Sequence, residues 1–228
     1  MINVEKTYIL HYSKLNDRRK RLESELSKYN IQADWILDFD QEYLTESMIN
    51  ESYDKSKESY NKKINPTYGL RTTPHRLLNI AEISCTFKHR EAIKRISIEC
   101  DNYGLILEDD VVFCNDFDIH FNTFMKSTPD DWDAIFMGSC ANLHVPSSIL
   151  KNSQTAYRIA HPSSRGGDSY LLKRDLAQKI TESMKTFVTI SDWELSYQLY
   201  LHDAKTYWWE PSLIAQGSEC GLYKSTLR

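Results

Sequence analysis

The sequence has few glycines and prolines, and it lacks the glycine-rich loops with which many proteins bind phosphate groups. Its 228 residues include 7 glycines and 6 prolines. The G-x-G-x-x-G pattern of dinucleotide-binding domains does not occur, and neither does the Walker pattern of phosphate-binding loops. A Rossmann dehydrogenase and a P-loop nucleotide hydrolase are therefore excluded as interpretations of this chain.

Cysteine is also scarce, and its spacing argues against the cysteine-dependent folds. The five cysteines are an odd number, stand far apart and include no C-x-x-C pair, unlike those of a zinc knuckle or a disulfide framework. Seven histidines occur without the H-E-x-x-H spacing of zinc proteases. We expect the cysteines to be reduced and half-buried.

Long apolar runs and an excess of basic residues are missing as well. No stretch approaches the roughly 20 apolar residues that span a bilayer, and the N-terminus does not resemble a secretory signal. The net charge of -4 gives no basic excess to neutralise a nucleic-acid backbone. We expect a cytoplasmic protein, provided that the chain is complete, without a nucleic-acid partner or a transmembrane segment. Peripheral membrane contact stays open.

The first 40 residues have the pattern of a strand, a helix and a second strand. Residues 7–12 and 33–39 are rich in strand-forming side chains, and Asn16 or Asp17 can cap a helix that runs to Tyr29. This order predicts a parallel sheet. Across residues 1–228 we expect one α/β domain with a mostly parallel central sheet flanked by helices. Further strands are expected over 103–112, 132–138, 169–172 and 206–209, and helices over 116–125, 175–184 and 192–201.

Residues 46–73 differ from the rest of the chain. Ser, Asn, Lys, Glu and Tyr dominate there, and the apolar periodicity fades. We interpret this stretch as a polar insertion that is ordered only in part and lies near an acceptor entrance. Pro74 then begins a helical region that is expected to break near Ser84 and to end near Cys100.

The most informative segment is an apolar strand that runs into Glu108-Asp109-Asp110. Adjacent carboxylates repel one another, so burying them is costly unless a cation compensates. In open α/β sheets, ligands gather at the carboxyl ends of strands. Strand alternation would place Glu108 and Asp110 on one side and Asp109 on the other. Hard oxygen ligands suit Mn²⁺ or Mg²⁺; a solvated turn at a strand end is the alternative.

Three further segments carry candidate site residues. Residues 84–90 include His89 and would present free N–H groups to an anion if Ser84 or Thr86 caps a helix, although a surface helix turn fits equally. The paired glycines before Asp168 allow close approach to a ligand or simply a tight turn. Ser191 can cap a helix whose first turn contains Asp192 and Glu194, and either carboxylate could instead be a general base.

Taken in order, these segments resemble glycosyltransferase family 25, which includes lipopolysaccharide and collagen galactosyltransferases. The resemblance rests on five motifs, none decisive alone. They are the opening strand and basic helix from Ile9 to Arg21, S-C-T-F-K-H over 84–89, L-I-L-E-D-D over 105–110, G-G-D-S-Y-L-L over 166–172, and Asp192 followed by the late segment 209–216. Ser84 and Lys88 depart from the family pattern, which has Gly and Ser there.

The resemblance implies a glycosyltransferase-A fold and an inverting transfer of a hexose, galactose or glucose, from a UDP-sugar to a hydroxyl of a glycan or glycoprotein acceptor. It implies Mn²⁺ or Mg²⁺ as cofactor. Asp110 and Glu108 would bind the metal, and Asp192 would be the catalytic base with Glu194 as the second choice. The donor would contact Glu108, Asp109, His89, Tyr12, Arg18 and Gly167. A nucleotide-sugar or carbohydrate-binding module without turnover, and a metal-dependent nucleotidyl or phosphoryl transferase, are the competing interpretations.

Overall fold

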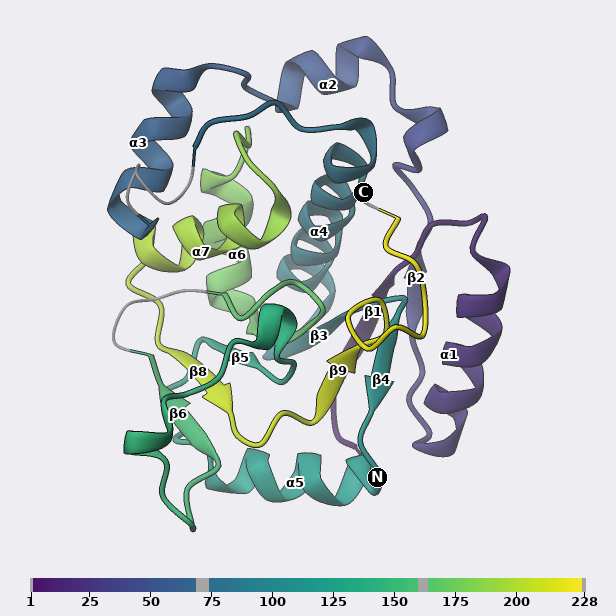
Figure 1. The fold of residues 1–228 in the computed structure, drawn as a ribbon, viewed down its shortest axis with the longest axis vertical. Coiled ribbons are helices and arrows are strands. Elements are labelled where there is room, and N and C mark those ends of the chain that lie inside the picture. Colours follow the sequence, from purple (N-terminus) through teal and green to yellow (C-terminus); the bar gives the residue numbers. More distant parts are fainter. Residues whose placement is uncertain (1, 69–73, 160–163, 227–228) are drawn as a thin grey trace.

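The computed structural model describes residues 2–68, 74–159 and 164–226 (Figure 1). The strands are β1 (Lys6–Leu10), β2 (Asp34–Ile36), β3 (Tyr103–Glu108), β4 (Val111–Phe113), β5 (Ala134–Phe136), β6 (Ala156–Arg158), β7 (Ser169–Lys173), β8 (Thr206–Trp209) and β9 (Ile214–Gln216). The α-helices are α1 (Asn16–Lys28), α2 (Glu46–Ser52), α3 (Lys57–Tyr68), α4 (Ile80–Glu99), α5 (Phe117–Ser127), α6 (Arg174–Ser183) and α7 (Ser191–Leu201). The described residues also form short 3-10 helices, which are η1 (Gln41–Tyr43), η2 (Cys140–Asn142) and η3 (Ser147–Ile149).

A seven-stranded sheet in the order β2-β1-β3-β7-β5-β8-β6 forms the centre of the molecule, and β4 pairs with β9 in a separate ribbon. The sheet is mixed. The pairs β1–β2, β1–β3 and β5–β8 are parallel, whereas β3–β7, β5–β7 and β6–β8 are antiparallel. The expected α/β class is confirmed, but the parallel majority is not, because apolar periodicity shows where a strand lies and not its direction.

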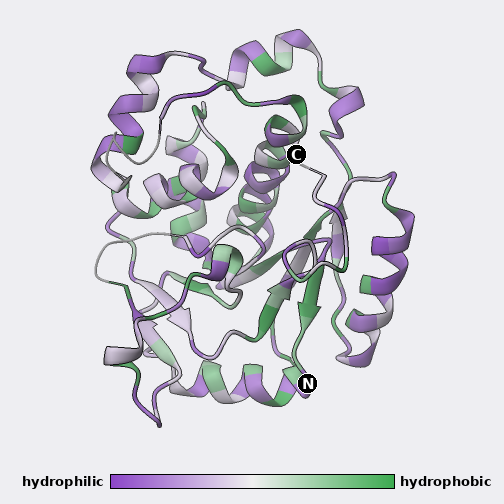
Figure 2. Cartoon of the chain, viewed as in Figure 1, coloured by the Kyte–Doolittle hydropathy of each residue, from purple (hydrophilic) through white to green (hydrophobic). Residues whose placement is uncertain are grey.

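Alternation along the strands sends side chains to two separate cores. On β1, Tyr8 and Leu10 join the core beneath α4, α6 and α7, while Ile9 joins the core beneath α1 and α5. On β3, Ile106 faces the first core and Leu107 the second. Figure 2 shows the central strands as predominantly apolar and α1 as predominantly polar on its outer side. Helices therefore cover both faces of the sheet.

Several helix boundaries differ from the expectation. Asn16 is the first residue of α1, and its N-cap residue Leu15 makes no side-chain cap, so neither Asn16 nor Asp17 is the cap. Helix α4 begins at Ile80 after a capping box between Asn79 and Glu82, and it continues without a break. Ser84 and Thr86 lie within it, so the expected helix start at these residues is wrong. The expected strand over 103–112 is divided by a turn at Asp109 and Asp110.

The polar stretch 46–73 is helical as far as the structure describes it. Helices α2 and α3 fill most of residues 46–68, and residues 69–73 lie outside the described part. Tyr60 and Ile64 of α3 are buried with Val188, next to the start of α7. The apolar periodicity of this stretch is weak because α2 and α3 are short helices that place few side chains in a core. Within the described residues, no helix is long and apolar enough to cross a membrane.

Candidate active site

Strands β1, β3 and β7 bring their ends to one edge of the sheet, and this edge holds the candidate site. Leu10 pairs with Glu108 in the parallel ladder of β1 and β3, so the residues that follow both strands meet there. Strand β7 is antiparallel to β3, and its first residue Ser169 pairs with Leu107. The segment before β7 therefore lies at the same edge, and the backbone N–H of Glu108 donates to the carbonyl of Asp168 over 2.8 Å. The carboxyl ends of parallel strands are where open α/β sheets bind ligands.

Glu108 is the residue at the centre of this edge. His89 Nε2 lies 3.4 Å from one carboxylate oxygen, and Gln216 Nε2 donates to the other over 3.0 Å. Burial, followed by the nearby charges of Asp110 and Asp109, raises the pKa of Glu108 to about 8. A positive ligand beside Glu108 would favour its ionised form.

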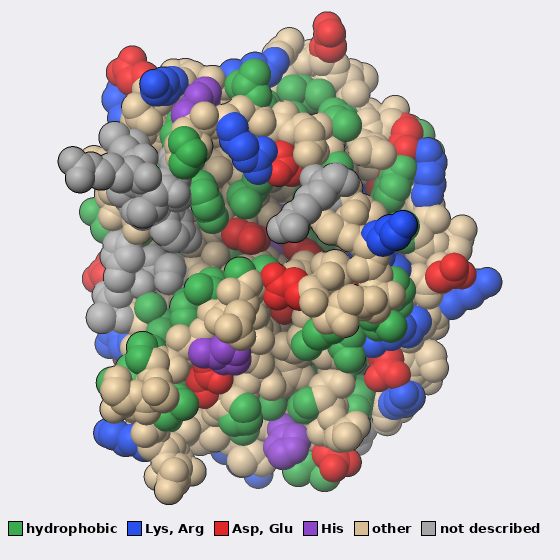
Figure 3. Space-filling view, viewed as in Figure 1, with side chains coloured by type: hydrophobic (Ala, Val, Ile, Leu, Met, Phe, Trp, Pro, Cys, Tyr) green, Lys and Arg blue, Asp and Glu red, His purple; other side chains and the backbone are tan. Residues whose placement is uncertain are grey.

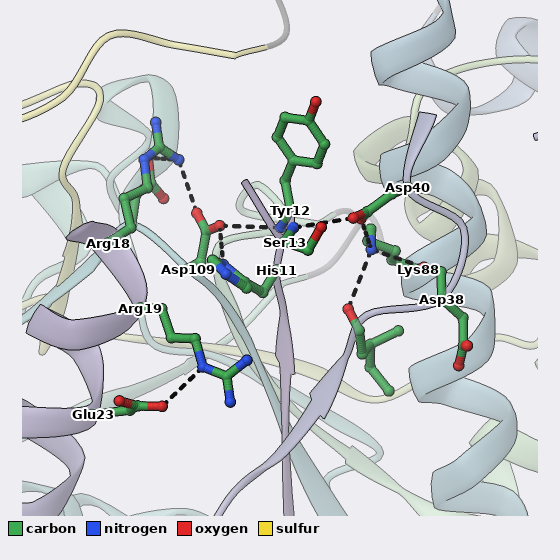
Figure 4. Close-up of polar contacts among 12 residues, drawn as sticks. His11, Tyr12, Ser13, Arg18, Arg19, Glu23, Asp38, Asp40, Lys88 and Asp109 are labelled. Carbon is green, nitrogen blue, oxygen red and sulfur yellow. Dashed lines mark hydrogen bonds and ion pairs between the residues drawn. The ribbon is translucent and has the colours of Figure 1, made fainter. Parts of the chain in front are cut away.

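Asp109 is occupied by partners from the first βα unit (Figure 4). His11 Nδ1 lies 2.8 Å from one of its oxygens, and Arg18 donates to the other over 2.8 Å. The backbone N–H of Tyr12 contacts the same carboxylate at 3.4 Å. Asp109 therefore fixes the loop after β1 against the turn after β3, with little hydrogen-bonding capacity left for a ligand.

Asp110 has the opposite character. The backbone N–H of Ser218 donates to its Oδ2 atom over 3.2 Å, whereas its buried Oδ1 atom has no hydrogen-bond partner among the described residues. Arg18 approaches Oδ2 only to 3.9 Å. Burial is the main cause that raises the pKa of Asp110, and the charge of Asp109 adds to it. An unpartnered buried carboxylate oxygen is a suitable ligand for a hard cation.

Asp192 lies at the start of α7, and its side chain packs against Gly167 at the same edge of the sheet. A Cβ atom on Gly167 would lie 2.6 Å from Asp192 Oδ1 and 3.0 Å from His89 Nε2, so this glycine leaves room for both side chains. The N-cap residue of α7 is Ile190, and no side chain caps the helix. Asp192 and Ser191 are therefore not caps. Burial and then the charge of Glu108 raise the pKa of Asp192 to about 6.

Glu194 has a different environment from Asp192. It is fully buried, forms an ion pair with Lys63 at 3.0 Å and accepts from the backbone N–H groups of Val188 and Thr189. These contacts join α3 to the turn before α7. Glu194 is absent from the residues that line the cleft described below, whereas Asp192 is among them.

The edge opens into a cleft with two halves, and acidic side chains gather in the hollowed centre of the face in Figure 3. The first half is lined by residues that include Tyr12, Arg18, Asp109 and Asp110, and we call it the donor half after the donor contacts that the family resemblance implies for the first three. The second has a volume of about 610 Å³ and is lined by residues that include Gly167, Asp192 and Glu219; we call it the acceptor half after the base role that the resemblance implies for Asp192. The two halves share their border, formed by Cys85, Glu108, Gln216, Ser218 and Ser225.

The C-terminal segment covers part of the donor half. Arg18 donates to the carbonyl of Lys224 over 2.7 Å, and its guanidinium lies 4.9 Å from the ring centroid of Tyr223. Ser225 and Thr226 line the donor half. Arg18 thus links the turn at Asp109 and Asp110, which we call the carboxylate turn, to this C-terminal segment.

Two buried residues, His89 and Asp168, lie behind the cleft. His89 Nδ1 contacts the hydroxyl of Tyr170 at 3.0 Å, and burial lowers the pKa of His89 to about 4. Both carboxylate oxygens of Asp168 lack a hydrogen-bond partner among the described residues, and burial raises its pKa well above the usual range. Gly138 provides the space for Asp168, because a Cβ atom there would lie 1.9 Å from Asp168 Oδ2.

Residues 4–194 match the profile of a known family, Glycosyltransferase family 25 (LPS biosynthesis protein). The chain belongs to this family. A search of curated proteins found no match. Family 25 glycosyltransferases have the GT-A fold, which agrees with the α/β architecture and confirms the expected class. The match includes the Glu108–Asp110 turn and Asp192, and it ends before Gln216.

The structure brings most of the predicted site residues to this cleft. Tyr12, Arg18, Glu108, Asp109 and Asp110 line the donor half. Gly167, which was expected among the donor contacts, lines the acceptor half together with Asp192, and His89 lies behind the border. Four contributors were missed as site residues: His11, Cys85, Asp168 and Gln216. Cys85 and Asp168 lie within the quoted motifs, and Gln216 lies in the quoted late segment, but no spacing rule identifies the contacts that they make.

Proposed function

We propose that this family 25 glycosyltransferase is an inverting enzyme that transfers a hexose, galactose or glucose, from a UDP-sugar to a hydroxyl of a glycan or glycoprotein acceptor. The observation that carries the proposal is the two-part cleft bordered by Glu108. Its donor half contains the Asp110 oxygen that has no hydrogen-bond partner among the described residues, and its acceptor half contains the carboxylate of Asp192. A metal-assisted inverting transfer can use one carboxylate to bind the cation and a second as the general base.

Asp110 and Glu108 would hold Mn²⁺ or Mg²⁺. The fit rests on the buried Oδ1 atom of Asp110, which has no partner in the described chain, and on the raised pKa values of both carboxyl groups. A bound divalent ion would supply charge neutralisation to the leaving diphosphate. Tyr12 and Arg18 would border the nucleotide, and Asp109 would keep Arg18 in place.

Asp192 would accept the proton of the acceptor hydroxyl. The hydroxyl oxygen forms a bond to the anomeric carbon as the bond between that carbon and the UDP oxygen breaks, and the proton passes to Asp192. Its raised pKa brings the carboxylate closer to the operating pH, as general-base catalysis requires. The partners of Glu194 instead favour a structural role at the start of α7.

A screen of UDP-sugars tests the proposal without knowledge of the acceptor. The chain should hydrolyse one UDP-hexose slowly, and only when Mn²⁺ or Mg²⁺ is present. Release of UDP identifies a sugar transferase, whereas release of pyrophosphate would indicate a nucleotidyl transferase. UDP-sugar binding without any hydrolysis or transfer would contradict the proposal and support a binding module.

A further inference from the structure

Cys85, His89 and Glu108 form a mixed set of ligand atoms at the border of the cleft. Each residue offers one possible metal ligand: the sulfur of Cys85, an imidazole nitrogen of His89 and a carboxylate oxygen of Glu108. In the structure these three atoms all lie within 4.8 Å of one another. Cys85 and His89 are four residues apart on α4, so they lie on the same face of the helix. Glu108 reaches them from the end of β3.

We propose that Cys85, His89 and Glu108 bind a zinc ion. Ligands of a tetrahedral zinc ion with bonds of about 2.0–2.3 Å are roughly 3.3–3.8 Å apart. Even at their 4.8 Å limit, the three atoms would need to close in by only about 1.0–1.5 Å to reach these separations. The thiol gives its proton to solvent as Sγ bonds the ion. Soft sulfur and imidazole ligands favour Zn²⁺ over Mn²⁺ and Mg²⁺, which prefer oxygen.

The surroundings of His89 support this site. Its Nδ1 atom lies 3.0 Å from the hydroxyl of the buried Tyr170. When the proton is on Nδ1, His89 donates to that hydroxyl, and the lone pair of Nε2 is turned toward Glu108. Metal-binding histidines generally have such a partner on the second nitrogen. Cys85 and Glu108 line both halves of the cleft, so an ion can enter, and water can occupy the fourth position.

The site has a consequence for the reaction, and this part alone rests on the proposed function. Zinc bound by Glu108 would hold the carboxylate toward α4 and withdraw it from the Mn²⁺ or Mg²⁺ of the donor half. Zn²⁺ would therefore inhibit transfer without resembling the donor or the acceptor. Asp110 belongs to the donor half and not to the zinc site, so the two sites can be separated by mutation.

Cobalt absorption on the full chain tests the binding itself. Co²⁺ titrated into the protein should give a thiolate-to-cobalt charge-transfer band, which Zn²⁺ then removes. Cys85→Ser should abolish the band, and Tyr170→Phe should weaken Co²⁺ affinity by about 10–100-fold. Cys220→Ser is the matched control, because Cys220 is exposed and absent from both halves of the cleft, and it should keep the band.

Two results would overturn the proposal. One is the absence of the band in the wild-type protein, and the other is its persistence in Cys85→Ser with loss in Cys140→Ser, which would move the site to the other cysteine of the cleft. His89→Gln provides a second variant if Cys85→Ser unfolds, and it should also lose the band. Asp110→Asn should keep the band. A failure of UDP-sugar turnover would therefore leave the zinc result unchanged.

Discussion

Asp192 occupies the space that a side chain at Gly167 would need, since a Cβ atom there would lie 2.6 Å from Asp192 Oδ1. Gly167→Ala should therefore displace the carboxylate while the fold survives. A shift of about 1 Å in a catalytic group can cost roughly 100-fold in rate, so we expect kcat to fall by that order. The coupling can be checked in an Asp192→Ala background, where only the 3.0 Å approach to His89 is left and the added methyl group should cost much less. Equal effects in both backgrounds would show that Gly167 acts independently of Asp192.

Asp192 and Glu194 should respond differently to loss of charge. Asp192→Asn should reduce transfer by roughly 100-fold or more, the usual loss of a general base. Its melting temperature and UDP affinity should stay near those of the wild type, because its side chain does not cap α7 and its hydrogen bond to Ser191 is long at 3.5 Å. Glu194→Gln should instead destabilise the protein, since it breaks a buried pair with Lys63. Survival of transfer in Asp192→Asn would remove Asp192 from the mechanism.

Lys88 should be a stability residue and not a phosphate-binding one. Its buried ammonium group contacts Asp40 at 2.7 Å and the carbonyls of Asp38 and Ile36 (Figure 4). Lys88→Met would leave the buried Asp40 carboxylate without its cation, which typically costs about 3–5 kcal/mol of unfolding free energy. Lys14→Met removes an exposed pair with Glu42, and solvent screening should make its cost much smaller than that of Lys88→Met. Urea unfolding of both variants measures the difference.

The sequence predicted the first βα unit and the carboxylate turn because both depend on local pattern. Short runs of apolar and strand-forming residues identify β1 and β3, and three acidic residues directly after a strand identify the edge where ligands bind. What sequence could not show is contact between distant segments. Arg18 and Asp109 are 91 residues apart, and Gln216 reaches Glu108 across 108 residues. These contacts depend on the parallel register of β1 with β3 and on the ribbon of β4 with β9.

The same limit explains how the three adjacent carboxylates separate. Strand alternation was expected to separate Asp109 from Glu108 and Asp110, but it could not show that Asp109 pairs with His11 and Arg18 from the first βα unit. Glu108 contacts α4 and β9, and Asp110 contacts the segment after β9.

The mobility of residues 46–73 stays a prediction, and hydrogen exchange across α2 and α3 would test it. High protection there without ligand would contradict it.

The rate of transfer should depend on pH through Asp192. The ionised carboxylate is the form that accepts a proton, and burial together with Glu108 raises its pKa to about 6. Activity should therefore be constant above that pH and fall about tenfold per pH unit below it. The profile of kcat at saturating donor measures this limb. An acidic limb near the ordinary aspartate pKa of about 3.9, or the same limb in the residual activity of Asp192→Asn, would assign the titration to another group.

Asp110 should be required for metal-dependent binding of UDP and dispensable for folding. Its Oδ1 atom has no partner in the described structure, and burial of the carboxyl group raises its pKa. Asp110→Asn removes a charge that folding does not compensate, so the melting temperature without metal should be equal to or higher than that of the wild type. Affinity for UDP in the presence of Mn²⁺ should fall by at least about tenfold. Mutation of a residue that only hydrogen-bonds to a metal ligand already lowers metal affinity by about that factor. Asp101→Asn is the control, because Asp101 is exposed and precedes the other end of β3.

Calorimetry that finds unchanged UDP–Mn²⁺ affinity in Asp110→Asn would exclude Asp110 as a metal ligand. An equal loss in Asp101→Asn would trace the effect to net charge and not to the donor half of the cleft.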